Sequence, residues 1–150
     1  MTKVAEYTAS LGMLFHKLSR APVVTIAKLR GCARGAGSEF ALACDMCFAS
    51  REHAILGQPE VRIGASPGAG GIQHLARRLG RSRALEVILS SEDVNAELAE
   101  RYGWINRAVP DSELDRFIEQ IAQRIAAFPA EAVADAKAAV NVLTVPVPTP

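Results

Sequence analysis

The sequence predicts a single α/β domain with parallel or mixed strands, because short apolar strand-like runs alternate with helical patterns along its 150 residues. The clearest example is a β-branched run at Val23–Ala27, followed by a glycine-rich turn and then by an apolar helix through Phe40. Hydrophobic residues make up 49% of the chain, which is enough to bury a core at the size of one ordinary domain.

The elements follow in order along the chain. Apolar residues at helical spacing predict a first helix that ends before Pro22 (Val4, Tyr7, Leu11, Leu14, Phe15 and Leu18). The later elements are predicted as a helix to Cys44, strands at Met46–Ala49 and Ala54–Leu56, a helix at Ile72–Leu79, a helix capped by Ser82, a short helix between Asn95 and Gly103, a strand at Trp104–Val109, a long helix capped by Asp111 or Ser112, and a last helix from near Pro129 through Val140. The tail with Pro146, Pro148 and Pro150 cannot be helical, so we expect polyproline II or disorder there.

The charge balance argues against nucleic acid and anionic membranes as partners. The net charge is +1, and 17 basic and 16 acidic residues are interleaved. Four arginines close together form either a solvated helix end or a contact for a phosphorylated ligand (Arg77, Arg78, Arg81 and Arg83). With no apolar run of roughly 18 residues and no secretory leader, we expect a soluble, cytoplasmic protein.

The cysteines and histidines do not predict a metal site. Cys44 and Cys47 form a single C-x-x-C pair without a second pair, and Asp45-Met46 between them is typical of a helix-to-strand junction. We expect these two cysteines and Cys32 to be small, partly buried thiols. The three histidines fall on different elements (His16, His53 and His74).

The segment from Gly31 to Glu39 could bind an anion. Gly35, Ala36 and Gly37 leave the backbone N–H groups almost bare, and a helix N-terminus just afterwards would stabilise an oxyanion or a phosphate. From spacing alone, Glu39 is either a favourable charge in the first helical turn or a catalytic group. A dinucleotide-binding turn starting at Gly35 is excluded, because its third glycine would fall on Phe40.

The ordered series of motifs resembles the crotonase superfamily, from about Ala21 to Asn141. The segments that carry the resemblance are Ala21–Val24, Gly31–Asp45, Phe48–Ser50, Gly57–Glu60, Pro67–Gly71 with Gln73, Leu75, Arg77 and Gly80, and Ala99–Asn106. The resemblance implies a crotonase-like spiral of ββα units in one partial domain. Its parts would be a leading helix at 1–20, an α/β core at 21–110, C-terminal helices at 111–143 and a proline-rich tail at 144–150.

The resemblance also implies an activity and a site. Ala36 falls where the family places the N–H donor to a thioester oxygen, and Glu39 and Glu60 fall on the two glutamates that hydratases of this family use as general acid and base. We assign the base to Glu60 and the acid to Glu39, although a shared water lets these roles exchange. The implied substrate-binding residues are Gly35, Gly37, Pro67, Gly68 and Gly70. The substrate would be an acyl-CoA thioester, with no metal or redox cofactor.

Two alternatives to hydration remain. Isomerases of the same family often keep one acidic group, so the presence of both glutamates favours adding water to the 2,3 double bond. The family's second oxyanion donor lies upstream of everything that matches here, and its final helices come after Pro150, so the chain resembles a truncated crotonase. A non-catalytic subunit is therefore the other alternative. An unpaired sheet edge near Val23 predicts association in solution, and the family resemblance implies a homo-oligomer, trimer or hexamer.

Overall fold

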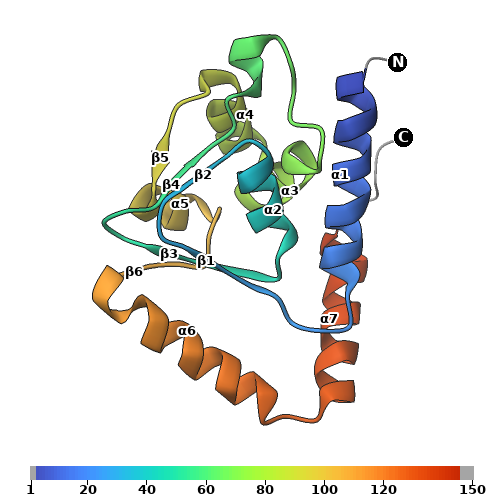
Figure 1. Ribbon diagram of the computed structural model, residues 1–150, viewed down its shortest axis with the longest axis vertical. Coiled ribbons are helices and arrows are strands. Elements are labelled where there is room, and N and C mark those ends of the chain that lie inside the picture. Colours follow the sequence, from blue (N-terminus) through green and yellow to red (C-terminus); the bar gives the residue numbers. More distant parts are fainter. Residues whose placement is uncertain (1–2, 146–150) are drawn as a thin grey trace.

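The structure, a computed structural model, describes residues 3–145 of the backbone and the side chains from Ser10 to Val145. It consists of two three-stranded sheets surrounded by helices (Figure 1). The helices are α1 (Lys3–Arg20), α2 (Ala36–Ala43), the 3-10 turn η1 (Glu60–Ile63), α3 (Gly71–Leu79), α4 (Arg81–Ser90), α5 (Ala96–Tyr102), α6 (Asp111–Ala126) and α7 (Ala130–Thr144). The strands are β1 (Ile26–Leu29), β2 (Cys32–Arg34), β3 (Met46–Ser50), β4 (Ile55–Gly57), β5 (Val94–Asn95) and β6 (Arg107–Val109).

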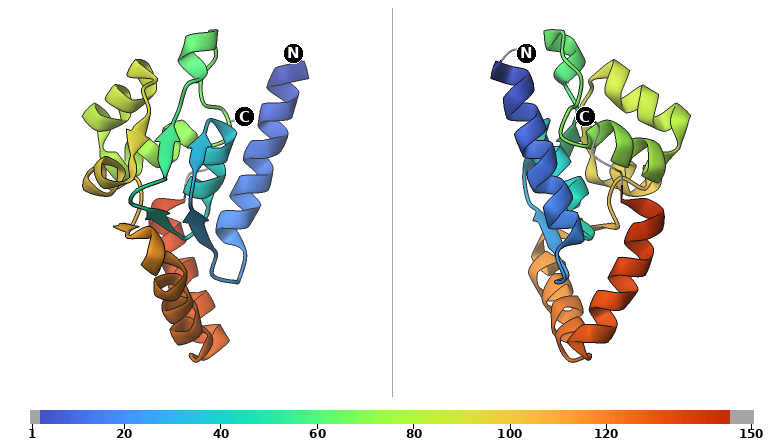
Figure 2. Two further views of the ribbon diagram at one scale, coloured as in Figure 1. Left: turned by 60° about the vertical axis from the view of Figure 1, so that its left-hand side comes forward. Right: turned by 90° about the vertical axis from the view of Figure 1, so that its right-hand side faces the viewer.

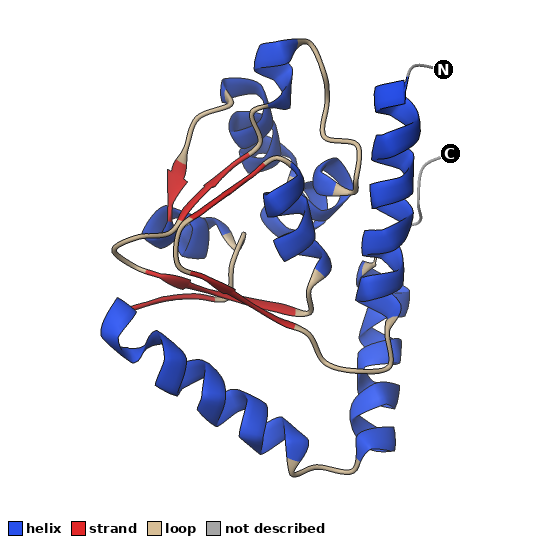
Figure 3. Ribbon diagram, viewed as in Figure 1, coloured by secondary structure: helices blue, strands red, loops and turns tan. Residues whose placement is uncertain are grey.

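The chain alternates between the two sheets. The first sheet has the order β1-β3-β6 and is entirely parallel, whereas the second has the order β2-β4-β5, with β2 and β4 parallel and β5 antiparallel to β4. Strands β1 to β4 therefore enter the two sheets alternately, β5 stays in the second sheet beside β4, and β6 returns to the first. Helix α2 brings the chain back to the first sheet after β2. This arrangement of ββα units, with helices at the C-terminal end, confirms the predicted α/β fold class (Figure 3).

The helices cover different faces of this double sheet. Helix α6 runs along the first sheet and contacts β1, β3 and β6, while α2 packs between α1 and α3 (Figure 1). Helix α1 lies along one side of the molecule (Figure 2), and its C-terminal end contacts α7. The main core lies between the second sheet and α2 to α5, where Leu42, Leu56, Leu75 and Trp104 are at most 1% exposed.

The first strand lies three residues later than predicted. Val23 is 61% exposed, and the backbone N–H and hydroxyl of Thr25 donate to the Asp45 carboxylate instead of joining a ladder. Pairing starts only at Ile26, opposite Met46. The short strands β2 and β5 and the turn η1 were not predicted, because elements of two to four residues are too short to show a period.

The predicted helix caps at Ser82, Asp111 and Ser112 are wrong. Gly80 occupies the N-cap position of α4 and Pro110 that of α6, and neither helix receives a side-chain cap bond. The Asp111 carboxylate instead accepts a hydrogen bond from Arg30, at 2.9 Å. The short helix predicted between Asn95 and Gly103 is confirmed as α5, and the Asn95 side chain caps it by accepting a hydrogen bond from the Leu98 N–H.

The strand predicted from Trp104 is shorter than expected. The Trp104 N–H donates to the Ala99 carbonyl at 2.8 Å, which closes the end of α5, and the strand begins only at Arg107. Asn106 bonds to Cys47 through both its backbone N–H and its side-chain oxygen. The predicted proline-rich conformation after Val145 lies outside the described residues.

Two of the three cysteines are buried and one is exposed. Cys44 and Cys47 lie at the junction between α2 and β3, as predicted, and burial raises the pKa of both thiols, that of Cys47 to about 12. Cys32 is exposed, which corrects the expectation that all three are partly buried. Its side chain leaves β2 on the solvent side, opposite the buried Ala33.

Helix α7 is attached to the core by polar contacts, and none of its described residues is buried. Lys137 donates to the Asp45 carboxylate at 2.8 Å and to the Val23 carbonyl at 2.7 Å, and the side chain of Lys137 is only 9% exposed. Asn141 donates to the Ser19 carbonyl at 2.9 Å. Lys137 therefore links α7 to the junction between α2 and β3.

Replacing Lys137 by Met is expected to lower the free energy of unfolding by about 3 kcal/mol, because it leaves the Asp45 carboxylate partly buried without its cation. The matched control is Lys28→Met, whose ion pair with Asp115 is exposed on both sides and should cost no more than about 0.5 kcal/mol. Urea denaturation followed by circular dichroism measures both. Equal losses for the two variants would contradict the assignment.

Candidate active site

The site forms where two parallel strands end side by side. Arg34 in β2 is paired with Gly57 in β4, and the Gly35 N–H donates to the Gly57 carbonyl at 3.0 Å. Since both strands point the same way, the segments that follow them emerge at the same edge of the sheet. The N-terminus of α2, beginning at Ala36, therefore lies beside the segment that leads to Glu60.

Ala36 is the first residue of α2, so its N–H has no partner within the helix. Ala36 and Gly37 are both exposed, and the small side chain of Ala36 and the absence of one at Gly37 leave the backbone of this turn open to a ligand. Gly35 precedes the helix with a φ of 54°, a conformation that favours glycine. The segment predicted to bind an anion is thus the N-terminal end of a helix.

Glu39 lies in the first turn of α2 and is only 3% exposed. Its Oε1 accepts hydrogen bonds from the backbone N–H groups of Ala69 and Gly71, both at 2.9 Å. These two donors come from the loop that leads into α3. The carboxylate is therefore held by backbone on one oxygen, and it joins α2 to the start of α3.

Glu60 lies beside Glu39 at the start of η1 and is partly exposed. The Gln58 Nε2 donates to both oxygens of the Glu60 carboxylate, at 3.3 Å each. A Cβ placed on Gly35 would lie 3.2 Å from the Glu60 Oε1, so this carboxylate reaches the turn before α2. The two predicted glutamates and the helix N-terminus are thus brought together.

The packing around these carboxylates depends on a glycine at position 71. A Cβ on Gly71 would lie 2.9 Å from the Glu39 Oε1 and 3.1 Å from the Gln58 Nε2, closer than side-chain carbons normally approach. The backbone of Gly71 therefore comes into direct contact with both polar groups. Gly71 and Ala69 belong to the motif that carries the family resemblance, but the motif does not predict that their N–H groups donate to Glu39.

The other predicted residues line the same loop. Pro67 is buried, Gly68 is exposed, and Gly70 caps α3 with a φ of 110°. They belong to the loop before α3 whose Ala69 and Gly71 N–H groups donate to Glu39. The buried Gln58 is a further polar residue of this site. The sequence placed it in the motif Gly57–Glu60 but assigned it no role.

Burial raises the pKa of Glu39 above its ordinary value, and the charge of Glu60 acts in the same direction. The hydrogen bonds from Gly71 and Ala69 oppose this rise without cancelling it. The folded protein thus holds a proton on Glu39 more tightly than the unfolded chain does. Among the two carboxyl groups, Glu39 is suited to be the proton donor.

The raised pKa predicts a pH dependence of stability. Since the folded state binds the Glu39 proton more tightly, the free energy of unfolding falls as the pH rises from the ordinary glutamate value, about 4.3, through the raised one. Glu39→Gln removes this dependence, so its stability relative to wild type should increase over that window. Denaturant titrations between pH 4 and pH 8 measure the difference. A difference that shrinks as the pH rises would refute the assignment.

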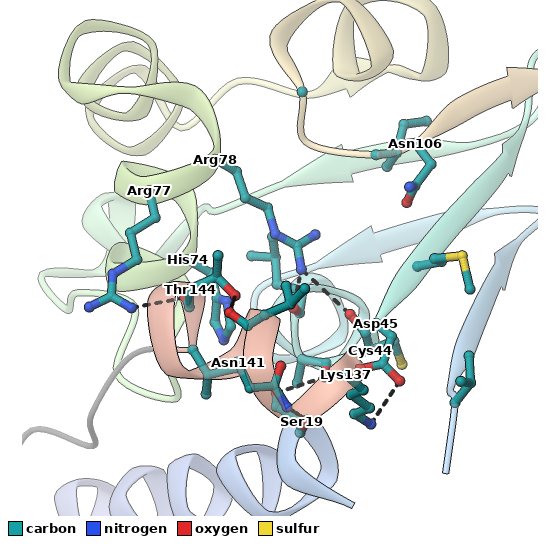
Figure 4. A pocket seen from close by; sticks show the side chains of 18 of the residues that line it. Ser19, Cys44, Asp45, His74, Arg77, Arg78, Asn106, Lys137, Asn141 and Thr144 are labelled. Carbon is teal, nitrogen blue, oxygen red and sulfur yellow. Dashed lines mark hydrogen bonds and ion pairs between the residues drawn. The ribbon is translucent and has the colours of Figure 1, made fainter. Parts of the chain in front are cut away.

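A cavity of about 580 Å³ lies elsewhere, between the C-terminal end of α2, α3 and α7 (Figure 4). There the Arg78 guanidinium donates to the Leu42 carbonyl at 2.7 Å, and burial lowers the pKa of His74 to about 4. Arg77 donates to the Thr144 carbonyl. Neither glutamate of the candidate site lines this cavity. Two of the four clustered arginines, Arg77 and Arg78, donate to backbone carbonyls near the C-terminal ends of α7 and α2.

Among the described side chains, those of residues 10–145, no group of three or more His, Cys, Asp or Glu residues could hold a metal ion. Within residues 3–145, none of the helices combines the length and the apolar character that crossing a bilayer requires.

The family model described as enoyl-CoA hydratase/isomerase matches residues 1–146. A curated relative from Dictyostelium discoideum, named as a mitochondrial enoyl-CoA hydratase, is 38% identical over 135 residues, which is 90% of this chain and 48% of that protein. The chain spans about half the length of the curated relatives that it matches.

Solved structures agree with these matches. A proposed enoyl-CoA hydratase from Streptomyces avermitilis is 65% identical and superposes with a TM-score of 0.93, covering 99% of this chain and 57% of that one. Another from Thermobifida fusca, solved in complex with CoA, is 32% identical with a TM-score of 0.87, covering 96% of this chain and 56% of that one.

Proposed function

Because the chain belongs to the enoyl-CoA hydratase/isomerase family, we propose that its site adds water across the 2,3 double bond of an acyl-CoA thioester. The observation that carries the proposal is the pair of carboxylates, Glu39 and Glu60, beside the free N-terminus of α2. The solved relative that binds CoA supports a coenzyme A thioester as the substrate. The proposed reaction needs no redox or metal cofactor, since the thioester is already activated.

In the proposed reaction, the carbonyl oxygen of the thioester accepts a hydrogen bond from the Ala36 N–H. Attack of water at C3 moves the double-bond electrons onto this oxygen, so negative charge develops there in the transition state. A backbone donor aimed at such a charge is worth about 3 kcal/mol. The partial positive charge of the α2 N-terminus acts in the same direction.

The two carboxyl groups move the protons. Glu60 takes a proton from the attacking water as its oxygen bonds to C3, and Glu39 gives a proton to C2 as the enolate electrons return. Because Oε1 of Glu39 already accepts two backbone N–H bonds, the proton to be delivered would sit on Oε2. The raised pKa of Glu39 supports its role as the acid. Proton exchange with bulk water would restore both groups for the next cycle.

The proposal is tested with the full chain and a four-carbon 2-enoyl-CoA. Hydration removes the conjugated thioester, so its ultraviolet absorbance should fall with time and a 3-hydroxyacyl-CoA should accumulate. An unconjugated 3-enoyl-CoA is the second substrate. Conversion of that substrate to the conjugated thioester, without hydration, would favour the isomerase alternative. A folded chain that is inert toward both would support the non-catalytic alternative.

A further inference from the structure

Gln58 has an unusual environment for an amide side chain. It is fully buried, at 0% exposure, directly after strand β4. Its Nε2 donates to both oxygens of Glu60, whereas its Oε1 has no hydrogen-bond partner among the described residues. The amide nitrogen also lies 3.1 Å from the position of a Cβ on Gly71. Gln58 is thus held between the Gly71 backbone and the Glu60 carboxylate.

This environment fixes which way the amide points. A carboxylate without a proton can only accept hydrogen bonds, so Glu60 selects the NH₂ end of Gln58 and leaves the oxygen end unpaired. A buried, unpaired amide oxygen costs stability that an apolar side chain of similar length would not. The two bonds to Glu60 are long, at 3.3 Å, and on ordinary packing grounds the position favours an apolar residue.

Glu60 needs such a partner because it is partly exposed. Gln58 supplies both side-chain hydrogen bonds that the Glu60 carboxylate receives within the described part of the chain. Without them, the Glu60 side chain could turn toward solvent, away from Glu39 and from the N-terminus of α2. Because the Gln58 Nε2 donates to both oxygens, it fixes the orientation of the carboxylate plane as well as its position.

We propose that Gln58 is a positioning residue, which orients the Glu60 carboxylate toward the reacting water at a cost in stability. The inference rests on the proposed hydration, in which Glu60 takes the proton of that water. Gln58 itself contributes no proton, because an amide neither gains nor loses one in this pH range. Its effect is on the geometry of its neighbour.

The test compares Gln58→Met, which keeps the length of the side chain but removes the donor, with Gln123→Met. Gln123 is the matched control, because its Nε2 also donates to a carboxylate, that of Glu119, on the exposed face of α6. For Gln58→Met we expect kcat to fall about 30-fold with KM within about threefold. The melting temperature should be unchanged or higher. Gln123→Met should leave kcat and KM at wild-type values.

A purely structural role would give a different result. A lower melting temperature of Gln58→Met with an unchanged kcat would overturn the proposal, as would equal effects in both variants. The side-chain amide resonance of Gln58 in a ¹⁵N spectrum, identified by its loss in Gln58→Met, tests the contact without any substrate. It should shift in Glu60→Gln and stay in place in Glu131→Gln. If wild type is inert, hydration fails as a function, while the amide shift still decides whether Gln58 holds Glu60.

Discussion

Replacing Glu60 by Gln is expected to lower kcat for hydration by about 10³-fold, within the range typical of removing a general base. The change is nearly isosteric, and the Gln58 amide can still donate to the new side-chain oxygen. Substrate binding through the N-terminus of α2 does not involve this side chain, so KM should change little. Steady-state rates of absorbance loss with a 2-enoyl-CoA measure both constants.

The control for this variant is Glu131→Gln, which makes the same change in the exposed first turn of α7 and should retain full activity. The double variant with Glu39→Gln should be only slightly slower than either single variant, because two groups that act on one water lose their effect together. Independent, multiplying losses would show that the two carboxyl groups do not act as a pair.

Replacing Gly71 by Ala is expected to lower kcat by about 100-fold and the free energy of unfolding by about 1–3 kcal/mol. The new methyl group would lie 2.9 Å from the Glu39 Oε1 and 3.1 Å from the Gln58 Nε2, so both groups must move. That displacement would break the hydrogen bond from the Gly71 N–H and shift the acid relative to Glu60. Enzyme kinetics and urea denaturation measure the two effects.

Gly31→Ala provides the comparison. A Cβ at Gly31 would have no atom within 4 Å, and its backbone does not have a positive φ. This variant should therefore keep its activity and change stability by no more than about 0.5 kcal/mol. A Gly71→Ala protein with normal kcat would mean that the Glu39 carboxylate tolerates displacement.

The sequence predicted those parts of the fold that show a period over several residues. Helix α3 and strand β3 were expected close to their observed bounds, because the apolar residues of α3 recur at helical spacing and those of β3 form an uninterrupted run. The strand β2 has three residues, and its pairing with β4 depends on a segment more than 20 residues away. The local sequence pattern cannot predict such a pairing, and these three residues therefore resemble part of the glycine-rich turn.

Some parts of the candidate site could also be predicted from the sequence and others could not. Glu39 and Glu60 were predicted because the motifs that contain them resemble a family, and Glu39 also fits the first turn of a helix. The bonds that hold them could not be predicted. They come from the backbone of Ala69 and Gly71, about 30 residues from Glu39 in the sequence, and from the amide of Gln58, which is fully buried in the folded chain. Chemistry carried by side-chain type can be read from a sequence, whereas the support given by backbone depends on the tertiary fold.

The passage of the chain from one sheet to the other at each unit also bears on the order in which the molecule folds. Neighbouring strands within a sheet are not consecutive in the chain, apart from β4 and β5, whose connection contains η1, α3 and α4. No hairpin is therefore present in residues 3–145 to nucleate either sheet, and every strand pair must close a long loop first, which slows folding. Gly35 and Glu60 come close together only after β2 has paired with β4. A collapsed intermediate in which α2 had formed but this pair had not would lack the acid–base pair, so catalytic activity should return later than helical circular dichroism during refolding.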